Sequence, residues 1–253
     1  MTVPPSLSIL IPTLDETDSL EETVRALLSN PSAHVREVIL IVCQKTTAAT
    51  LQVCGGLRAK YGERVRIIKQ SLPSLGGAFR SGIGAANGSH TLLMFADLES
   101  DPRVVPVMVA EAEANPGSVI SASRWIRKGG FVRYGCIKLV LNYCFQRLCG
   151  AVLNSRVTDF TYGFRLYPSA ILKNTEWRET DHAFVLETIL GPLLDHVPVY
   201  EVPALWSPRR DGTRRSRFRQ YLHYIPTLLR IAIFHPRHQR LKAERVPSSA
   251  AIR

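Results

Sequence analysis

The chain has 253 residues, of which 45% are hydrophobic and 21% charged, and its formal net charge is +11. This length and hydrophobic content suit one large α/β domain with a full core, so no second domain is required. The five cysteines are odd in number and contain no C-x-x-C pair, which argues against a disulfide framework or a zinc site and favours reduced thiols in the cytosol.

Apolar strands and amphipathic helices alternate along the first half of the chain. In order, we expect a strand at 7–12, a helix with Leu20, Val24, Leu27 and Leu28 on one face, and then strands at 37–42, 65–69, 90–96 and 118–123 separated by helices near 47–61, 77–86 and 103–114. Near-continuous apolar strands in this alternation predict a mostly parallel sheet with helices on both faces.

The alternation is less regular after Arg124. We expect a glycine-rich loop at 128–130, a helix near 134–153, a strand at 160–167, a helix near 182–194, a strand at 197–205 and a helix near 218–233. The apolar stretches at 139–153 and 225–234 are interrupted by polar residues or are too short, so no transmembrane helix is predicted. The first residues read as a strand rather than a signal peptide.

Positive charge is concentrated at the end of the chain. The segment from Arg209 to Arg253 contains twelve Arg or Lys and only two acidic residues, Asp211 and Glu244. Such a segment suits an anionic membrane surface, nucleic acid or a phosphorylated substrate, and a solvated tail without a partner is the simpler alternative. Aromatic residues for base stacking are sparse there, so we favour the membrane over nucleic acid. We expect 1–234 to form the domain and 235–253 a basic, flexible tail.

The segment TLLMFADLESDP (91–102) is the most informative. An apolar strand ends there in Asp97, Glu99 and Asp101, followed by Pro102. In α/β sheets ligands collect at the carboxyl ends of strands, so these acids suit a cation with a polyphosphate. A plain helix start, with Asp101 as N-cap and Pro102 as first residue, explains those two residues but not Asp97 and Glu99.

Three further clusters accompany this one. They are IPTLDETDSL at 11–20, GGAFRSGIGAANGS at 76–89, and the pair SRWIRKGG at 123–130 with DFTYGFRLY at 159–167. In the second cluster, small residues let backbone approach a ligand while Arg80 reaches it. Its spacing matches neither a P-loop nor a dinucleotide fingerprint, so alone it is a weak phosphate signal.

Taken in order, these motifs resemble those of the family 2 glycosyltransferases of GT-A fold, in the branch of dolichyl-phosphate mannose synthase and other polyprenyl-phosphate glycosyltransferases. The resemblance covers about 6–217. It rests on IPTLDE, GGAFRSGIGAANG, ADLESDP, the SRW…GG loop, DFTYGFRLY, the glutamate of FVLE, and EVPALWSPRRDG. It implies a Rossmann-like GT-A domain that transfers a sugar from a nucleotide donor to a lipid phosphate.

The resemblance also implies roles for individual residues. The resemblance implies that the nucleotide-sugar donor binds beside Pro12, Thr13, Asp15, Glu16, Gly77 and Arg80, and that Asp97 and Glu99 hold Mg²⁺ or Mn²⁺. It implies that the donor and acceptor phosphates contact Arg124, Arg133, Arg165 and Arg209. The catalytic residues that it implies are Asp97, Arg124, Arg165 and Glu187. Purely structural roles stay open for four of these residues. Glu16 would stabilise a helix N-terminus, Arg133 would be a solvated surface charge, Arg165 would form a buried ion pair with Asp159, and Glu187 would be a structural hydrogen-bond partner.

Two positions depart from the family pattern. The first aspartate of its metal motif falls on Phe95, which removes one anionic ligand for the cation. The aspartate that helps to read the nucleobase falls on Cys43 or Gln44, so the base of the donor is left open.

The mechanism implied is a one-step displacement with inversion. A phosphate acceptor is already anionic, so no strong base is needed. The expected partners are a nucleotide sugar, polyprenyl phosphate and an anionic membrane surface, with a membrane protein as the alternative anchor and no nucleic acid. We expect a cytoplasmic protein, peripheral on the inner face of a membrane, docked through its basic end and the apolar residues of 221–234 unless those pack on the core.

The sequence leaves three rival functions open. A family 2 enzyme acting on a glycan or a protein would have less use for the arginine-rich second half. A nucleotidyltransferase lacks support because its glycine-lysine signature is absent from IPTLDETDSL. A catalytically impaired, membrane-associated sugar-nucleotide binder is favoured by Phe95 and Cys43.

Overall fold

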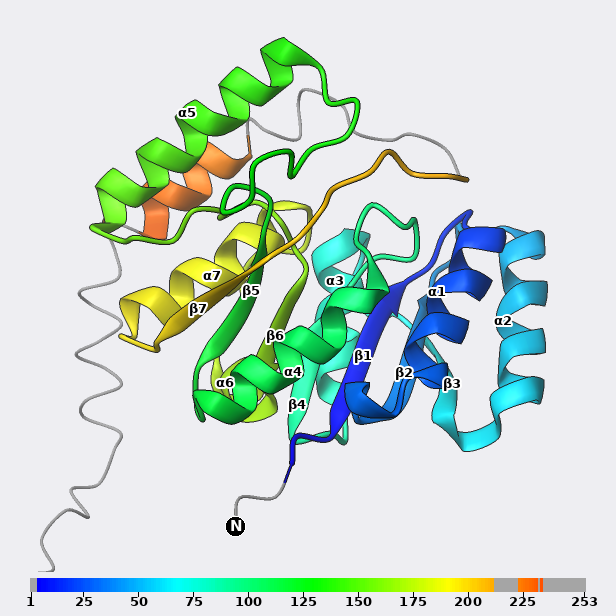
Figure 1. Ribbon diagram of the computed structural model, residues 1–253. Helices are drawn as coiled ribbons and strands as arrows, with labels where there is room; N and C mark the ends of the chain where they lie inside the picture. Colours follow the sequence, from blue (N-terminus) through cyan, green and yellow to red (C-terminus); the bar gives the residue numbers. More distant parts are fainter. Residues whose placement is uncertain (1–3, 212–222, 232, 234–253) are drawn as a thin grey trace, which may run out of the picture.

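The computed structural model describes residues 4–211, 223–231 and 233. Its centre is a seven-stranded sheet in the order β3-β2-β1-β4-β6-β5-β7, with helices on both faces (Figure 1). The strands are β1 Leu7–Pro12, β2 Val35–Val42, β3 Val65–Lys69, β4 His90–Leu93, β5 Val119–Ser123, β6 Arg165–Pro168 and β7 Val199–Pro203. The α-helices are α1 Asp18–Ser29, α2 Ala48–Tyr61, α3 Ser74–Ala85, α4 Val105–Ala114, α5 Cys136–Leu153, α6 Ser169–Asn174 and α7 Ala183–Leu194.

The sheet is parallel except at β6. Strand β1 pairs in parallel with β2 and β4, and β5 pairs in parallel with β7, whereas β6 runs antiparallel to both β4 and β5. The prediction of a mostly parallel α/β sheet covered on both faces is therefore confirmed. Because β1 has β2 and β4 on either side, the strand order reverses there, and the crevice outside the carboxyl ends of these strands is where such sheets bind ligands.

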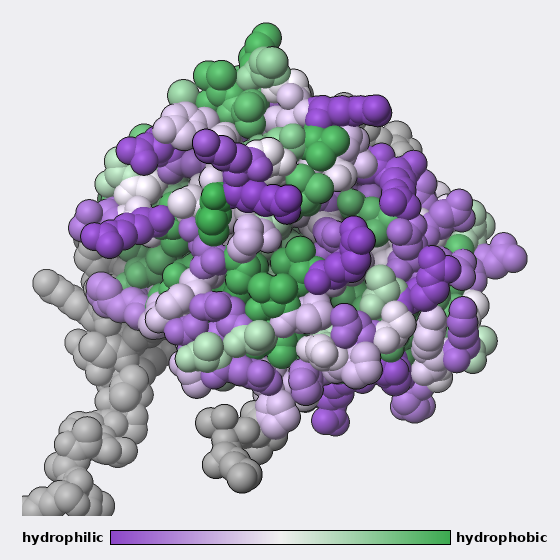
Figure 2. Space-filling model, viewed as in Figure 1, coloured by the Kyte–Doolittle hydropathy of each residue, from purple (hydrophilic) through white to green (hydrophobic). Residues whose placement is uncertain are grey.

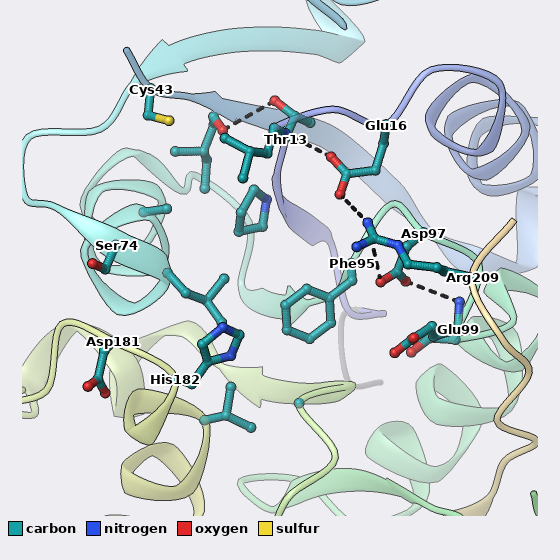
Figure 3. A pocket seen from close by; sticks show the side chains of 18 of the residues that line it. Thr13, Glu16, Cys43, Ser74, Phe95, Asp97, Glu99, Asp181, His182 and Arg209 are labelled. Atoms are coloured by element: carbon teal, nitrogen blue, oxygen red, sulfur yellow. Dashed lines mark hydrogen bonds and ion pairs between the residues drawn. The ribbon is translucent and has the colours of Figure 1, made fainter. Parts of the chain in front are cut away.

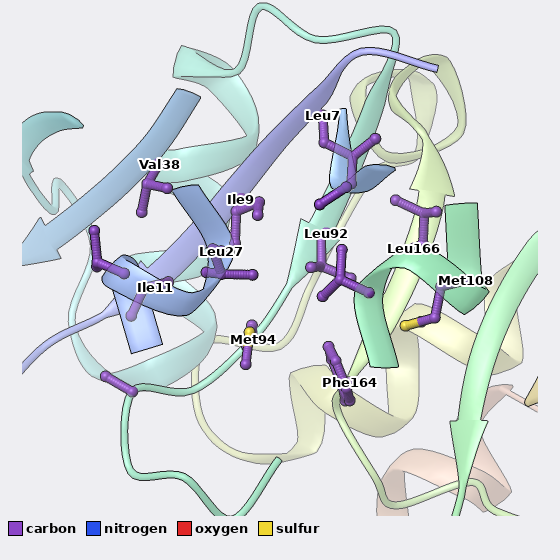
Figure 4. Packing of buried hydrophobic residues seen from close by; sticks show 14 of the residues in the cluster. Leu7, Ile9, Ile11, Leu27, Val38, Leu92, Met94, Met108, Phe164 and Leu166 are labelled. Carbon is purple, nitrogen blue, oxygen red and sulfur yellow. The ribbon is translucent and has the colours of Figure 1, made fainter. Parts of the chain in front are cut away.

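The core lies in two layers, one on each face of the sheet. Along β1, Leu7, Ile9 and Ile11 belong to the layer that includes α1 and α4 residues such as Met108 (Figure 4), whereas Leu10 belongs to the layer of α3 and α7. This period of two is the strand alternation expected from the sequence. Burial of each large side chain contributes about 1.5–3 kcal/mol, so these layers hold the strand ends that carry the site.

Several boundaries differ from the sequence prediction. Strand β4 ends at Leu93 rather than 96, and β6 begins at Arg165 rather than 160. The second difference has a local cause, because the backbone N–H groups of Thr161 and Tyr162 turn to donate to the Asp159 carboxylate. Asp101 does cap the following helical turn, as predicted, by accepting from Arg103 N.

The end of the chain is described in part. Residues 224–231 and 233 are helical and lie beside α5 (Figure 1), with the Phe145 and Tyr224 rings 5.8 Å apart. On this segment Tyr224 and Leu228 are buried while Ile225 and Leu229 are exposed, so one face packs on the core and the other does not. Most of the basic segment lies outside the described residues, including Arg214, Arg215, Arg217, Arg219 and the predicted tail at 235–253.

Candidate active site

A pocket of about 980 Å³ opens at the carboxyl ends of the strands. Its wall includes residues that follow β1 to β5, together with side chains from α3, α5, α7 and the segment after β7. A cavity of this size suits a ligand larger than a simple metabolite. Of the residues predicted to act, the wall contains Pro12, Thr13, Glu16, Asp97, Glu99, Arg124 and Arg209.

The acidic pair stands on the loop after β4. Leu98, between the two acids, has a φ of 57°, a left-handed conformation that costs a leucine about 1–2 kcal/mol. In this turn the Glu99 N–H donates to Asp97 Oδ1 at 3.1 Å, and Trp206 Nε1 donates to Glu99 Oε2 at 3.1 Å. Strain kept at a pocket wall, and a fixed orientation of both carboxylates, are typical of a functional loop.

Burial raises the pKa of Asp97 to about 7, and the nearby charge of Glu99 adds to the rise. A carboxylate in such surroundings is destabilised in its ionised form, and a cation bound to the pair would relieve that cost. Among the described residues no three His, Cys, Asp or Glu gather to form a closed metal site. Two carboxylates nevertheless fit Mg²⁺ or Mn²⁺ of the kind that takes its other ligands from water and substrate phosphates.

Arg209 joins two of the predicted clusters. Its Nη2 lies 2.7 Å from Glu16 Oε1 and 4.0 Å from Asp97 Oδ2 (Figure 3). The other oxygen of Glu16 accepts the N–H groups of Leu14 and Asp15, at 2.7 and 3.2 Å. Glu16 therefore fixes the loop after β1 and orients the guanidinium of a residue 193 positions later beside the acidic pair.

Arg124 forms a two-pronged ion pair with Asp159. Nε and Nη2 of Arg124 lie 2.7 and 2.8 Å from the two carboxylate oxygens, and both side chains are buried. Nη2 also donates to Thr161 Oγ1 at 3.0 Å, and Gln146 of α5 donates to the same oxygen. Burial lowers the pKa of Arg124, but the charge of Asp159 outweighs it and raises the pKa above its usual value, so this cation is permanent.

Six predicted residues lie off the pocket wall: Asp15, Gly77, Arg80, Arg133, Arg165 and Glu187. Arg165 is completely buried and donates to Val185 O, Ser121 Oγ and Asp159 O at 2.7, 3.1 and 3.2 Å. In this structure its guanidinium does not reach the pocket; it ties β5 and β6 to the start of α7. The simple buried pair with Asp159 is also not found, because that carboxylate is held by Arg124 instead.

Glu187 and Gly77 also contact other parts of the protein backbone rather than the pocket. Glu187 accepts the backbone N–H groups of Arg178 and Glu179 at 3.1 and 2.9 Å, which fixes the loop before α7. At Gly77 an added Cβ would stand 2.4 Å from Leu72 O, so this glycine makes room for backbone rather than ligand. Arg133 is exposed, with a φ of 50°.

Sequence reasoning missed two histidines in the wall, His182 and His223. His182 points into the pocket between α3 and α7, and burial lowers its pKa, so its imidazole is neutral at neutral pH (Figure 3). Nδ1 of His223 lies 2.6 Å from Oδ2 of Asp181, whose other oxygen accepts the N–H of Ala183, the first residue of α7. The Asp181-His182 dipeptide before FVLE, at a helix start, is the signal that could have found His182.

The two departures from the family pattern both face this pocket. Phe95 lines it and packs edge-on against Phe79, with centroids 5.7 Å apart. An apolar ring therefore occupies the side of the pocket where a further acid was expected. Cys43 and Gln44 also line the pocket, next to Lys45.

Comparison with known proteins matches residues 8–175 to the family model described as glycosyl transferase family 2. The chain belongs to glycosyl transferase family 2. Among curated proteins it is 25% identical over 233 residues to a dodecaprenyl-phosphate galacturonate synthase of Rhizobium johnstonii, covering 90% of this chain and 67% of that one. It is 24% identical over 236 residues to a dolichol-phosphate mannosyltransferase of Pyrococcus furiosus, covering 89% and 63%.

The chain therefore spans about two thirds of the length of these relatives. Among solved structures, this glycosyltransferase resembles glucosyl-3-phosphoglycerate synthase of Mycobacterium tuberculosis in complex with Mn²⁺, UDP and phosphoglyceric acid, with a TM-score of 0.70, 15% identity, and 90% and 78% of the two chains covered. The same enzyme with Mg²⁺ and UDP gives 0.68 and 14%. At this identity the likeness establishes the fold, and the predicted GT-A architecture is confirmed.

Proposed function

We propose that this glycosyltransferase moves a sugar from a nucleotide-sugar donor to a polyprenyl phosphate, in one displacement with inversion. The observation that carries the proposal is the placement of Arg124 in the same pocket as Asp97 and Glu99. A permanent buried cation and an acidic pair in one pocket suit a reaction between a donor with a diphosphate leaving group and an anionic acceptor. The names of the two curated relatives support the same acceptor class.

On the donor side, Pro12, Thr13 and Glu16 border the nucleotide, and Asp97 with Glu99 would hold Mg²⁺ or Mn²⁺ against the diphosphate. The cation, when bound, supplies neutralisation of charge on the leaving group. Arg209, fixed by Glu16, adds a second positive charge where the diphosphate departs. Removal of one such electrostatic contact typically costs about 10²–10³ in rate.

On the acceptor side, Arg124 is joined by Lys138 and Asn142 of α5, which also line the pocket. A phosphate monoester carries one to two negative charges at neutral pH, so its oxygen attacks the anomeric carbon without a strong base. Asp159 and Thr161 fix the position of the Arg124 guanidinium in the pocket wall. Arg165 and Glu187 do not contact the substrates in this proposal. They are positioning residues that fix β5, β6 and the loop before α7.

A second function is favoured by His182. A neutral imidazole inside the pocket could accept the proton of a hydroxyl acceptor, as a family 2 enzyme acting on a glycan requires. The two functions make different predictions for His182→Gln. Transfer to a phosphate acceptor should keep its rate within about threefold, whereas transfer to a hydroxyl should fall by about 10²-fold or more.

The direct test combines the full chain with polyprenyl phosphate and a panel of UDP, GDP and other nucleotide sugars, in Mg²⁺ or Mn²⁺. We expect one donor to give a lipid-linked sugar whose anomeric configuration is inverted. Because Cys43 and Gln44 stand at the position of the base-reading aspartate, the panel must include every base. Transfer to a glycan but not to the lipid would overturn the proposal, and donor binding without any turnover would identify a catalytically impaired binder.

We further propose that the protein works at the cytoplasmic side of a membrane, as a peripheral enzyme. A lipid-phosphate acceptor requires contact with a bilayer, and the basic balance of 209–253 suits an anionic surface. Fractionation of cells into soluble and membrane pools, followed by release with salt, tests this placement. Release only by detergent would contradict a peripheral association.

A further inference from the structure

Helix α5 has its amphipathic pattern reversed. Its body-facing residues include Asn142 and Gln146, which are buried and donate to Thr161 Oγ1 at 3.3 and 2.8 Å. Its outward residues include Ile137, Val140 and Leu148, which are 80%, 60% and 45% exposed. A surface helix in water normally presents charges outward, so this apolar face needs a partner.

The outward residues form one stripe. Ile137, Val140, Leu141, Cys144, Leu148 and Ala151 follow the three- and four-residue spacing of a single helix face. Hydrophobic side chains gather at the top of the molecule, over the upper end of α5 (Figures 1 and 2). The exposed Ile225 and Leu229 lie on the helical segment beside it.

Charge around this stripe has one sign. Between Glu113 and Asp159 the sequence contains no Asp or Glu but seven Arg or Lys, of which only Arg124 is buried. The other six are Arg127, Lys128, Arg133, Lys138, Arg147 and Arg156. An apolar stripe on a segment that carries basic residues and no acid is complementary to anionic lipid headgroups above hydrocarbon.

We propose that α5 lies flat in the surface of an anionic lipid bilayer, with this stripe inserted among the acyl chains. The inference deepens the proposed function, since it rests on a lipid acceptor. By length and composition alone, α5 is long and apolar enough to cross a membrane. Its hydrogen bonds from Asn142 and Gln146 to the body hold it instead parallel to the protein surface, which is the geometry of an interfacial helix.

The same helix connects the bilayer to the pocket. Lys138 and Asn142 line the pocket from α5, while Ile137 and Val140 lie outside the pocket and are exposed. With the stripe inserted, these two polar side chains lie near headgroup level, where the phosphate of a lipid acceptor resides. Docking by α5 therefore presents the pocket mouth to the phosphate, and the acyl chain need not leave the membrane.

The test is sedimentation of the full chain with vesicles of phosphatidylcholine alone or mixed with phosphatidylglycerol. We expect binding to the mixed vesicles, weakened by salt because the basic residues are screened. The double variant Val140→Glu with Leu148→Glu should bind about tenfold more weakly or worse, since two apolar side chains no longer insert. A matched control, Leu51→Glu with Val107→Glu, changes residues of similar exposure, 46% and 53%, on α2 and α4, and should bind as wild type does.

A second readout needs no substitution. Cys144 is exposed on the stripe, so mixed vesicles should slow its alkylation by a water-soluble maleimide, as followed by peptide mass spectrometry. Equal binding by wild type and the α5 variant overturns the proposal. So does a wild-type dimer that the α5 variant dissociates without any vesicle binding, because the stripe is then a contact between copies. Neither assay requires sugar transfer, so failure of the proposed function is recognised separately.

Discussion

Replacing Asp97 by Asn should stabilise the protein when no cation is present. The Asp97 side chain is only 13% exposed and lies beside Glu99, and its pKa is raised from 3.8 to about 7. Between these two values the folded state holds a proton on Asp97 that the unfolded chain releases. The free energy of unfolding therefore falls as the pH rises from about 4 to about 7. A shift of about three units, at about 1.4 kcal/mol each, sets a ceiling of about 4 kcal/mol on the destabilisation above pH 7.

The assay is thermal unfolding of wild type and Asp97→Asn across this pH range in chelator. The difference should be small near pH 4, where Asp97 is protonated, and should grow toward pH 8, with about 2–4 °C in Tm for each kcal/mol. Added Mg²⁺ or Mn²⁺ should raise the Tm of wild type but not of the variant, and turnover of the variant should fall by about 10²-fold or more. A variant less stable than wild type at high pH without cation would refute the reasoning, and full wild-type activity in chelator would refute the metal assignment.

Other perturbations test the supports of the site. Gly77→Ala should lower the free energy of unfolding by about 1–3 kcal/mol because the added Cβ meets the Leu72 carbonyl. Gly84→Ala in the same helix, where nothing lies within 4 Å of the added Cβ, should raise it by up to about 1 kcal/mol. Equal effects of the two substitutions in urea unfolding would contradict the close contact at Gly77. Asp159→Asn leaves a buried guanidinium without its counter-charge and should cost about 3–5 kcal/mol by the same measurement, so a cost below 1 kcal/mol would show that water reaches the pair. Arg165→Lys should lower Tm because one ammonium cannot serve three acceptors in different directions, and an unchanged Tm with lost turnover would instead mean that Arg165 touches the phosphate.

Sequence alone determined the sheet and the acidic loop. Apolar strands of period two, helices of period 3.6 and the acids at 97 and 99 are local patterns, and the carboxyl ends of parallel strands necessarily share one edge. The family resemblance added Pro12, Thr13 and Glu16, which follow the first strand or end it, to the same edge as Asp97. The family followed from motifs in a fixed order along the chain.

Tertiary structure decided which of the arginines face the pocket. Both Arg124 and Arg165 belong to predicted motifs, yet Arg124 lines the pocket and Arg165 is completely buried. The acceptors that hold Arg165 come from β5, from the loop before β6 and from α7, and only the fold brings these segments together. The pairing of Arg209 with Glu16 joins residues nearly 200 positions apart, and no local pattern encodes such a contact. The exposed apolar stripe of α5 could not be predicted from the sequence either. Periodicity shows that a helix has two faces, but only tertiary packing decides which face the rest of the protein covers.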